Sequence, residues 1–185
     1  MKLRLLASML VILMLSGCSR METAAPTQPP SSETITADEY AVLSALIDSL
    51  YPKSAATTMI VHDSTSTGIY QDNLDSVMTL LLQHLAQYVP VLKAETMLDF
   101  KTKNLTRAYI QDPVSIHPNC ILSSTSQTVY PWFEVSRVGF RSDRQQAIAY
   151  IGHMIVPRAG LGTYYVLFRD NNKWRITGFM NSWVS

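Results

Sequence analysis

The basic side chains of the C-terminal third could recognise an anion. Residues 132–185 hold seven basic and three acidic residues, whereas residues 18–131 hold six basic and eleven acidic ones. A cationic surface attracts anionic ligands, protein partners or lipid headgroups. We therefore predict a ligand-binding surface on one open face of a sheet, formed by four residues: Arg137, Arg141, Lys173 and Arg175. The charge difference also has a second interpretation, in which the two layers attract each other at their rims and bind nothing.

The four histidines are candidates for acid–base chemistry, but no two of them have the spacing of a known metal motif. His62 and Asp63 are neighbours in a predicted strand, where successive side chains point to opposite faces, so we do not expect them to act together. The sequence therefore predicts no catalytic residue, no metal and no cofactor. The alternative is a hydrolase-type enzyme with His62 or His153 as its base and a nearby carboxylate: Asp63, Asp99 or Glu134.

Two further groups receive structural interpretations. Gly160-Leu161-Gly162 lacks the rest of a dinucleotide-binding fingerprint and precedes a strand pattern, so we expect a tight turn there. Cys120 begins the apolar run Cys-Ile-Leu, which favours a small buried hydrophobe over a reactive thiol.

Helical signals dominate the first part of the chain. Thr36-Ala37-Asp38-Glu39 is a capping box, which predicts a helix that begins there and ends at Tyr51-Pro52. Apolar residues recur at helical spacing over residues 72–88 and, more weakly, over 93–103. The β-branched segment 57–65 between the first two helices predicts a strand.

From Cys120 onward the apolar period is two, which predicts antiparallel strands. In segment 136–141, alternation puts Val138 and Phe140 toward the core and both arginines toward solvent. Further strands follow over residues 146–156 and up to Phe168, and Asn171-Asn172 suits a tight hairpin before the last strand. Helices first and strands afterwards predict an α+β fold, with the helices on one face of a curved antiparallel sheet.

This order of elements resembles cystatin-like or nuclear-transport-factor-like cones. Four short motifs also resemble those of a group of uncharacterised exported bacterial proteins: Glu39 to Val42, Ser136 to Phe140, the Gly160, Gly162 and Tyr164 pattern, and Trp183 to Ser185. The resemblance implies a shared fold over most of the domain and supplies no catalytic residue.

The N-terminus predicts export. Lys2 and Arg4 precede the apolar run Leu5 to Leu15, which is a secretory signal pattern and, at eleven residues, is shorter than a membrane span of about 20 residues. The next residues, Leu15-Ser16-Gly17-Cys18, resemble the lipobox of bacterial lipoproteins. The resemblance implies cleavage before Cys18 and a diacylglyceryl group on its sulfur, which would anchor the chain in a membrane.

The predicted organisation has three parts: a signal peptide over 1–17, a lipidated cysteine with a disordered tether over 18–35, and one α+β domain over 36–185. Without residues 1–17 the net charge is −1, which does not favour nucleic acid. We therefore expect a membrane-anchored lipoprotein of the bacterial cell envelope, with its domain facing the periplasm or the exterior. Its expected role is a non-catalytic binding or accessory module for an envelope protein or a small anionic ligand.

Overall fold

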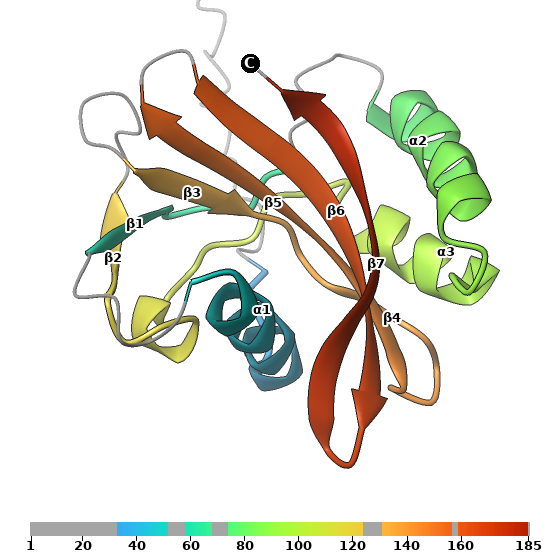
Figure 1. The fold of residues 1–185 in the computed structure, drawn as a ribbon, viewed down its shortest axis with the longest axis horizontal. Helices are drawn as coiled ribbons and strands as arrows, with labels where there is room; N and C mark the ends of the chain where they lie inside the picture. Colours follow the sequence, from blue (N-terminus) through green and yellow to red (C-terminus); the bar gives the residue numbers. More distant parts are fainter. Residues whose placement is uncertain (1–32, 52–57, 68–73, 124–130, 157–158, 185) are drawn as a thin grey trace, which may run out of the picture. The chain divides into compact units, whose positions relative to one another are not determined.

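The computed structural model describes residues 33–51, 58–67, 74–123, 131–156 and 159–184. In these ranges three α-helices accompany a seven-stranded sheet (Figure 1). The helices are α1 (Ala37–Leu50), α2 (Leu74–Tyr88) and α3 (Ala94–Lys103), with a short 3-10 helix, η1 (Pro113–Ser115). The strands are β1 (Met59–His62), β2 (Cys120–Ser123), β3 (Trp132–Val135), β4 (Gly139–Phe140), β5 (Gln146–Val156), β6 (Ala159–Asp170) and β7 (Lys173–Val184). The predicted α+β class with a curved sheet is confirmed.

The sheet is mixed. Its strand order is β2-β1-β3-β5-β6-β7, and β4 pairs with β5. All pairs from β3 to β7 are antiparallel, as predicted, whereas β1 runs parallel to both β2 and β3. The long connection from β1 to β2 contains α2 and α3, and a crossover of this kind allows parallel pairing.

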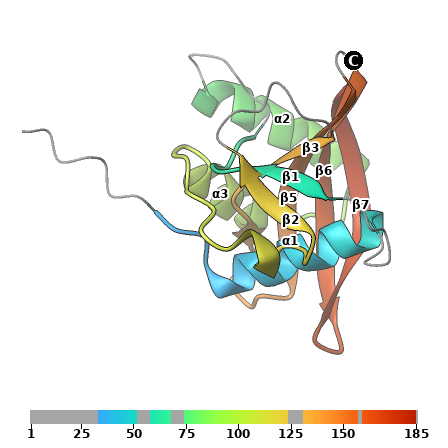
Figure 2. The same cartoon turned by 90° about the vertical axis from the view of Figure 1, so that its left-hand side faces the viewer.

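Helices cover both faces of the sheet. Successive residues of β5 therefore belong to two different hydrophobic clusters. Ala147, Ala149 and Ile151 belong to a hydrophobic cluster with α1, which we call the α1 core. Ile148 and Tyr150 belong to a second cluster with α2 and α3, the α2–α3 core. Figure 1 and Figure 2 show α1 on one side of the strands and α2 with α3 on the other. The prediction that all helices lie on one face was therefore wrong, because β5 is buried on both faces.

The capping box at the start of α1 is confirmed. The Thr36 hydroxyl accepts a hydrogen bond from the Glu39 amide at 3.3 Å, and the Glu39 carboxylate accepts one from the Thr36 amide at 2.9 Å. Two residues before this cap already pack on the fold: Thr34 forms a β-bridge with Tyr109, and Ile35 is buried. The folded unit thus includes residues that the sequence interpretation assigned to the tether.

Three local predictions in the sheet have different outcomes. Asn171 and Asn172 have φ values of 48° and 61°, as the predicted hairpin requires. Gly160 and Gly162 lie within β6, so the turn expected there was wrong. Cys120 is buried in the α1 core, and burial raises the pKa of its thiol to about 12.

Segment 136–141 forms less strand than predicted. Only Gly139 and Phe140 pair with β5, whereas residues 136–138 have no regular structure. α3 packs directly on β4, and a Cβ atom on Gly139 would lie 2.4 Å from Phe100 Cβ and 2.5 Å from Phe100 Cα. Glycine at this position therefore allows the close approach of α3 and β4.

We predict that Gly139→Ala destabilises the domain by about 3 kcal/mol, because the new methyl group meets backbone atoms that cannot rotate away. Gly178→Ala is the matched control, since its Cβ would meet only side-chain atoms, those of Val89, the nearest at 2.6 Å. Its expected cost is about 1 kcal/mol. Urea unfolding followed by circular dichroism measures both free energies. Equal costs for the two variants would contradict the proposed tight contact at β4.

Candidate ligand-binding cleft

Arg137 does not lie on an open face of the sheet, so its predicted placement was wrong. Arg137 is only 6% exposed, and its Nε donates a hydrogen bond to Glu39 Oε1 at 3.1 Å. A second carboxylate, that of Glu33, also accepts from this guanidinium. Alternation failed here because residue 137 lies outside β4, in irregular backbone that turns toward α1.

The other three predicted cations lie on two different parts of the fold. Arg141 is in the turn between β4 and β5 (residues 141–145), where its guanidinium pairs with Asp143. Lys173 and Arg175 are exposed at the start of β7, and Arg175 Nε lies 3.6 Å from Asp170 Oδ2. The structure thus separates Arg141 from the β7 pair and removes Arg137 from the predicted surface.

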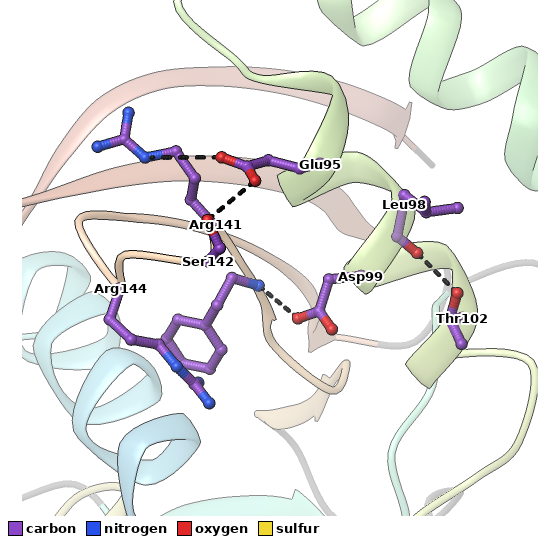
Figure 3. A pocket seen from close by; sticks show the side chains of 8 residues that line it. Glu95, Leu98, Asp99, Thr102, Arg141, Ser142 and Arg144 are labelled. Carbon is purple, nitrogen blue, oxygen red and sulfur yellow. Dashed lines mark hydrogen bonds and ion pairs between the residues drawn. The ribbon is translucent and has the colours of Figure 1, made fainter.

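Arg141 lines a cleft of about 390 Å³ between α3 and the β4–β5 turn. Figure 3 shows α3 side chains facing those of the turn across this cleft. The cleft is open, because Leu98 on its wall is 64% exposed. Its lining residues are Glu95, Leu98, Asp99, Thr102, Phe140, Arg141, Ser142 and Arg144.

Two carboxylates of α3 hold the opposite wall of the cleft. Asp99 Oδ2 accepts a hydrogen bond from the Phe140 amide at 2.7 Å, and Glu95 Oε2 accepts one from the Ser142 hydroxyl at 3.0 Å. Lys103 Nζ lies 2.8 Å from Asp99 Oδ2 on the same helix. These contacts fix β4 and the turn against α3.

Arg144 lines the cleft and has an unusual backbone conformation. Its φ is 57°, a left-handed value that is uncommon for a residue other than glycine and that recurs at functional sites. Its guanidinium lies 4.5 Å from the centre of the Phe140 ring, and Lys103 Nζ lies 4.9 Å from the same ring. Both distances suit cation–π attraction.

The cleft presents charges of both signs. Arg141 and Arg144 line it together with Glu95 and Asp99. Outside this lining, hydrogen bonding to the Arg141 guanidinium lowers the pKa of Asp143. Glu95 Oε1 also lies 4.0 Å from Arg141 Nε. Because Arg141 already pairs with carboxylates of its own chain, the cleft suits a polar ligand with both donors and acceptors better than a simple anion.

His62 and Asp63 approach each other, contrary to the prediction. His62 Nδ1 lies 3.5 Å from Asp63 Oδ1. β1 ends at His62 and Asp63 lies in a bend, so the alternation of a strand no longer separates the two side chains. Two other histidines lie on separate elements: His84 is exposed on α2, and His117 is buried with its Nε2 4.0 Å from Asp48 Oδ1.

His153 contacts a phenol and a phenyl ring. Its Nδ1 lies 2.5 Å from the Tyr51 hydroxyl oxygen, and its ring stacks on Phe133 with centroids 4.2 Å apart. Burial lowers the pKa of His153 to about 4. Glu134, one of its predicted partners, instead accepts a hydrogen bond from the Tyr150 hydroxyl at 3.0 Å. Tyr150 belongs to the α2–α3 core, so this carboxylate lies on the other face of the sheet.

Comparisons of the chain with models of protein families, with curated proteins and with solved structures find no match. Among the described residues, no three histidine, cysteine, aspartate or glutamate side chains are grouped so that they could hold a metal ion. No helix in the same ranges is long and apolar enough to cross a membrane.

We predict that His153 makes the domain less stable as the pH falls from about 6.5 to about 4. In this window the unfolded chain binds a proton that the folded protein excludes, and the full loss is about 3 kcal/mol. His153→Phe keeps a ring on Phe133 and should flatten the stability profile between these pH values. Urea unfolding at several pH values measures how the unfolding free energy depends on pH.

Tyr51→Phe is the control for this prediction. It removes the hydroxyl beside His153 but leaves the burial that lowers the pKa, so the pH dependence should persist. If the unfolding free energy of His153→Phe depended on pH as steeply as that of the wild type, another group would be responsible for the loss of stability at low pH.

Proposed function

We propose that this protein is a lipoprotein of the bacterial cell envelope, anchored in a membrane through Cys18, whose domain binds a protein partner at the α3–β4 cleft. The signal pattern and the Leu15-Ser16-Gly17-Cys18 motif support the anchor. The observation that carries the binding role is the cleft itself, whose walls are joined by the Asp99 and Glu95 hydrogen bonds. Prior ordering of this kind lowers the entropic cost of binding.

The shape and chemistry of the cleft favour a protein segment over an enclosed small molecule. Small-molecule sites are concave, mostly apolar and bury most of their ligand. This cleft instead exposes Leu98 and carries Arg141 and Arg144 beside two carboxylates, a combination of apolar and charged groups that suits a protein interface with a polar rim.

A hydrolase-type enzyme is the second candidate, and the His62–Asp63 contact is the observation in its favour. A carboxylate beside an imidazole could orient it as a general base. At 3.5 Å, however, the two groups are further apart than the usual hydrogen-bond range. His153 is held by Tyr51, and no carboxylate among the described residues orients it. The cleft therefore supports binding better than either histidine supports hydrolysis.

Site-specific photocrosslinking in native envelopes tests the proposed binding role. A crosslinking residue in place of Leu98 should capture one discrete partner, because this position lies on the cleft wall. The matched control is Leu80, which is also an exposed helix leucine, at 66% against 64%, but lies on α2. Adding Glu95→Lys should lower the Leu98 crosslink about tenfold, because it reverses a charge and breaks the bond to Ser142.

The anchor is tested in the same cells. Cys18→Ala should move the protein from the membrane fraction to the soluble fraction, since no acyl chain can then be attached. Equal crosslinking from Leu98 and Leu80, or no effect of Glu95→Lys, would contradict the cleft. Mass spectrometry that finds an unmodified Cys18 in the processed protein would contradict the anchor.

A further inference from the structure

A short loop after α3 carries a leucine, an arginine and a tyrosine whose side chains reach solvent. Leu105 is 44% exposed and Tyr109 is 54% exposed, and Arg107 between them is exposed as well. Within the described part of the chain, no carboxylate forms an ion pair with Arg107. We call residues 105–109 the α3 loop.

Hydrogen bonds hold the α3 loop at both ends. Asn104, the C-cap of α3, donates from its side-chain amide to the Arg137 carbonyl at 3.1 Å and accepts from the Arg137 amide at 2.9 Å. At the other end, the Ala108 amide donates to Thr65 Oγ1 at 2.9 Å, and Ala108 is buried in the α1 core. The loop is thus fixed on the domain while its other side chains face outward. Such ordering before binding lowers the entropic cost of a contact.

The described chain enters the domain beside this loop (Figure 2). The Tyr109 amide donates to the Glu33 carbonyl at 3.3 Å, and Tyr109 forms a parallel bridge with Thr34. The Glu33 carboxylate pairs with Arg137, which fixes the point of entry. The predicted tether, residues 18–32, would hold Glu33 about 20 Å on average from the proposed acyl anchor. The α3 loop is therefore the surface of the domain next to the end of the tether.

The side chains of the α3 loop suit the interface between a bilayer and water. A tyrosine ring is apolar at its body and polar at its tip, and such rings gather at the level of the lipid headgroups. Arginine lays its aliphatic stem along apolar surface while its guanidinium binds phosphate. The exposed leucine adds apolar area that can leave water.

We propose that the α3 loop docks the domain onto the lipid surface in which Cys18 is anchored. Leu105 and Tyr109 enter the boundary between headgroups and acyl chains, and Arg107 contacts lipid phosphates. Two apolar side chains bind a bilayer weakly by themselves. The tether makes their contact intramolecular, however, with an effective concentration on the order of mM, so a weak intrinsic affinity is sufficient. The inference rests on the proposed anchor and gives the anchored domain an orientation, but it does not require a partner at the α3–β4 cleft.

Fluorescence of the acylated full chain in vesicles tests the docking. The vesicles contain phosphatidylethanolamine and phosphatidylglycerol, and some acyl chains carry bromine, which quenches a dye only within the membrane. Leu105→Cys carries a polarity-sensitive dye, and Cys120 does not compete for it because its thiol is buried. The matched control is Leu80→Cys with the same dye, since Leu80 is 66% exposed on α2. We expect a blue shift and quenching at position 105 and neither at position 80.

Two further changes in the chain labelled at position 105 measure what each neighbour contributes. Tyr109→Ser should lower the ratio of docked to undocked domain about tenfold, because the ring no longer leaves water. Arg107→Glu should lower it about tenfold as well, because it reverses a charge at an anionic surface. Arg175→Glu is the control for charge reversal and should leave the ratio unchanged, since Arg175 is exposed at the start of β7. All three side chains are exposed, and thermal melting checks that each variant folds.

Flotation with the vesicles reports the anchor and the dye reports the docking, so the two can fail separately. A floating chain whose dye at position 105 stays in water, or is quenched no more than at position 80, would overturn the docking and leave the anchor in place. A dye shielded in native envelopes but not in pure lipid would also overturn it, because the occupant of the loop would then be a protein. A chain that does not float would contradict the proposed anchor, and the docking would fall with it.

Discussion

The buried ion pair between Glu39 and Arg137 is the interaction on which the rest of the structure depends. The Glu39 carboxylate is inaccessible to solvent and accepts hydrogen bonds from the Thr36 cap, from the Arg137 guanidinium and from the Val138 amide. Burial alone would raise the pKa of Glu39, but these bonds, chiefly that of Arg137, outweigh it and lower the pKa. A buried charge is tolerated only with such complete pairing. One carboxylate therefore joins the start of α1 to the segment that leads into β4, and so places Gly139 and Phe140 against α3.

The basic residues of the C-terminal third divide into two groups with different roles. Arg137 pairs with Glu39 of α1 and with Glu33 before it, and Arg141 pairs with Glu95 of α3 and with Asp143 of its own turn. These pairs are the attraction between layers that the charge difference also allowed. Arg144 and Arg169 instead lie over aromatic rings, those of Phe140 and Trp174.

Local signals in the sequence were enough to predict most elements. The Thr36 capping box, the segment 146–156 and the Asn171-Asn172 hairpin each depend on residues close together in the chain. The parallel pairing of β1 and the burial of Arg137 depend on contacts between distant segments, which periodicity does not contain. The same limit applies to the site: Arg141 was predicted, whereas Glu95 joins it only because α3 packs on β4.

Arg137 serves the fold and not a ligand, and a double-mutant cycle of unfolding free energies tests this role most directly. Glu39→Gln and Arg137→Met should each cost about 3 kcal/mol, because each leaves a buried polar group without its partner. The double variant should be little worse than either single one, which gives a coupling energy of about 2 kcal/mol or more. Additive losses of about 0.5 kcal/mol each would show that the pair does not hold the fold together, and would contradict the structural role of Arg137.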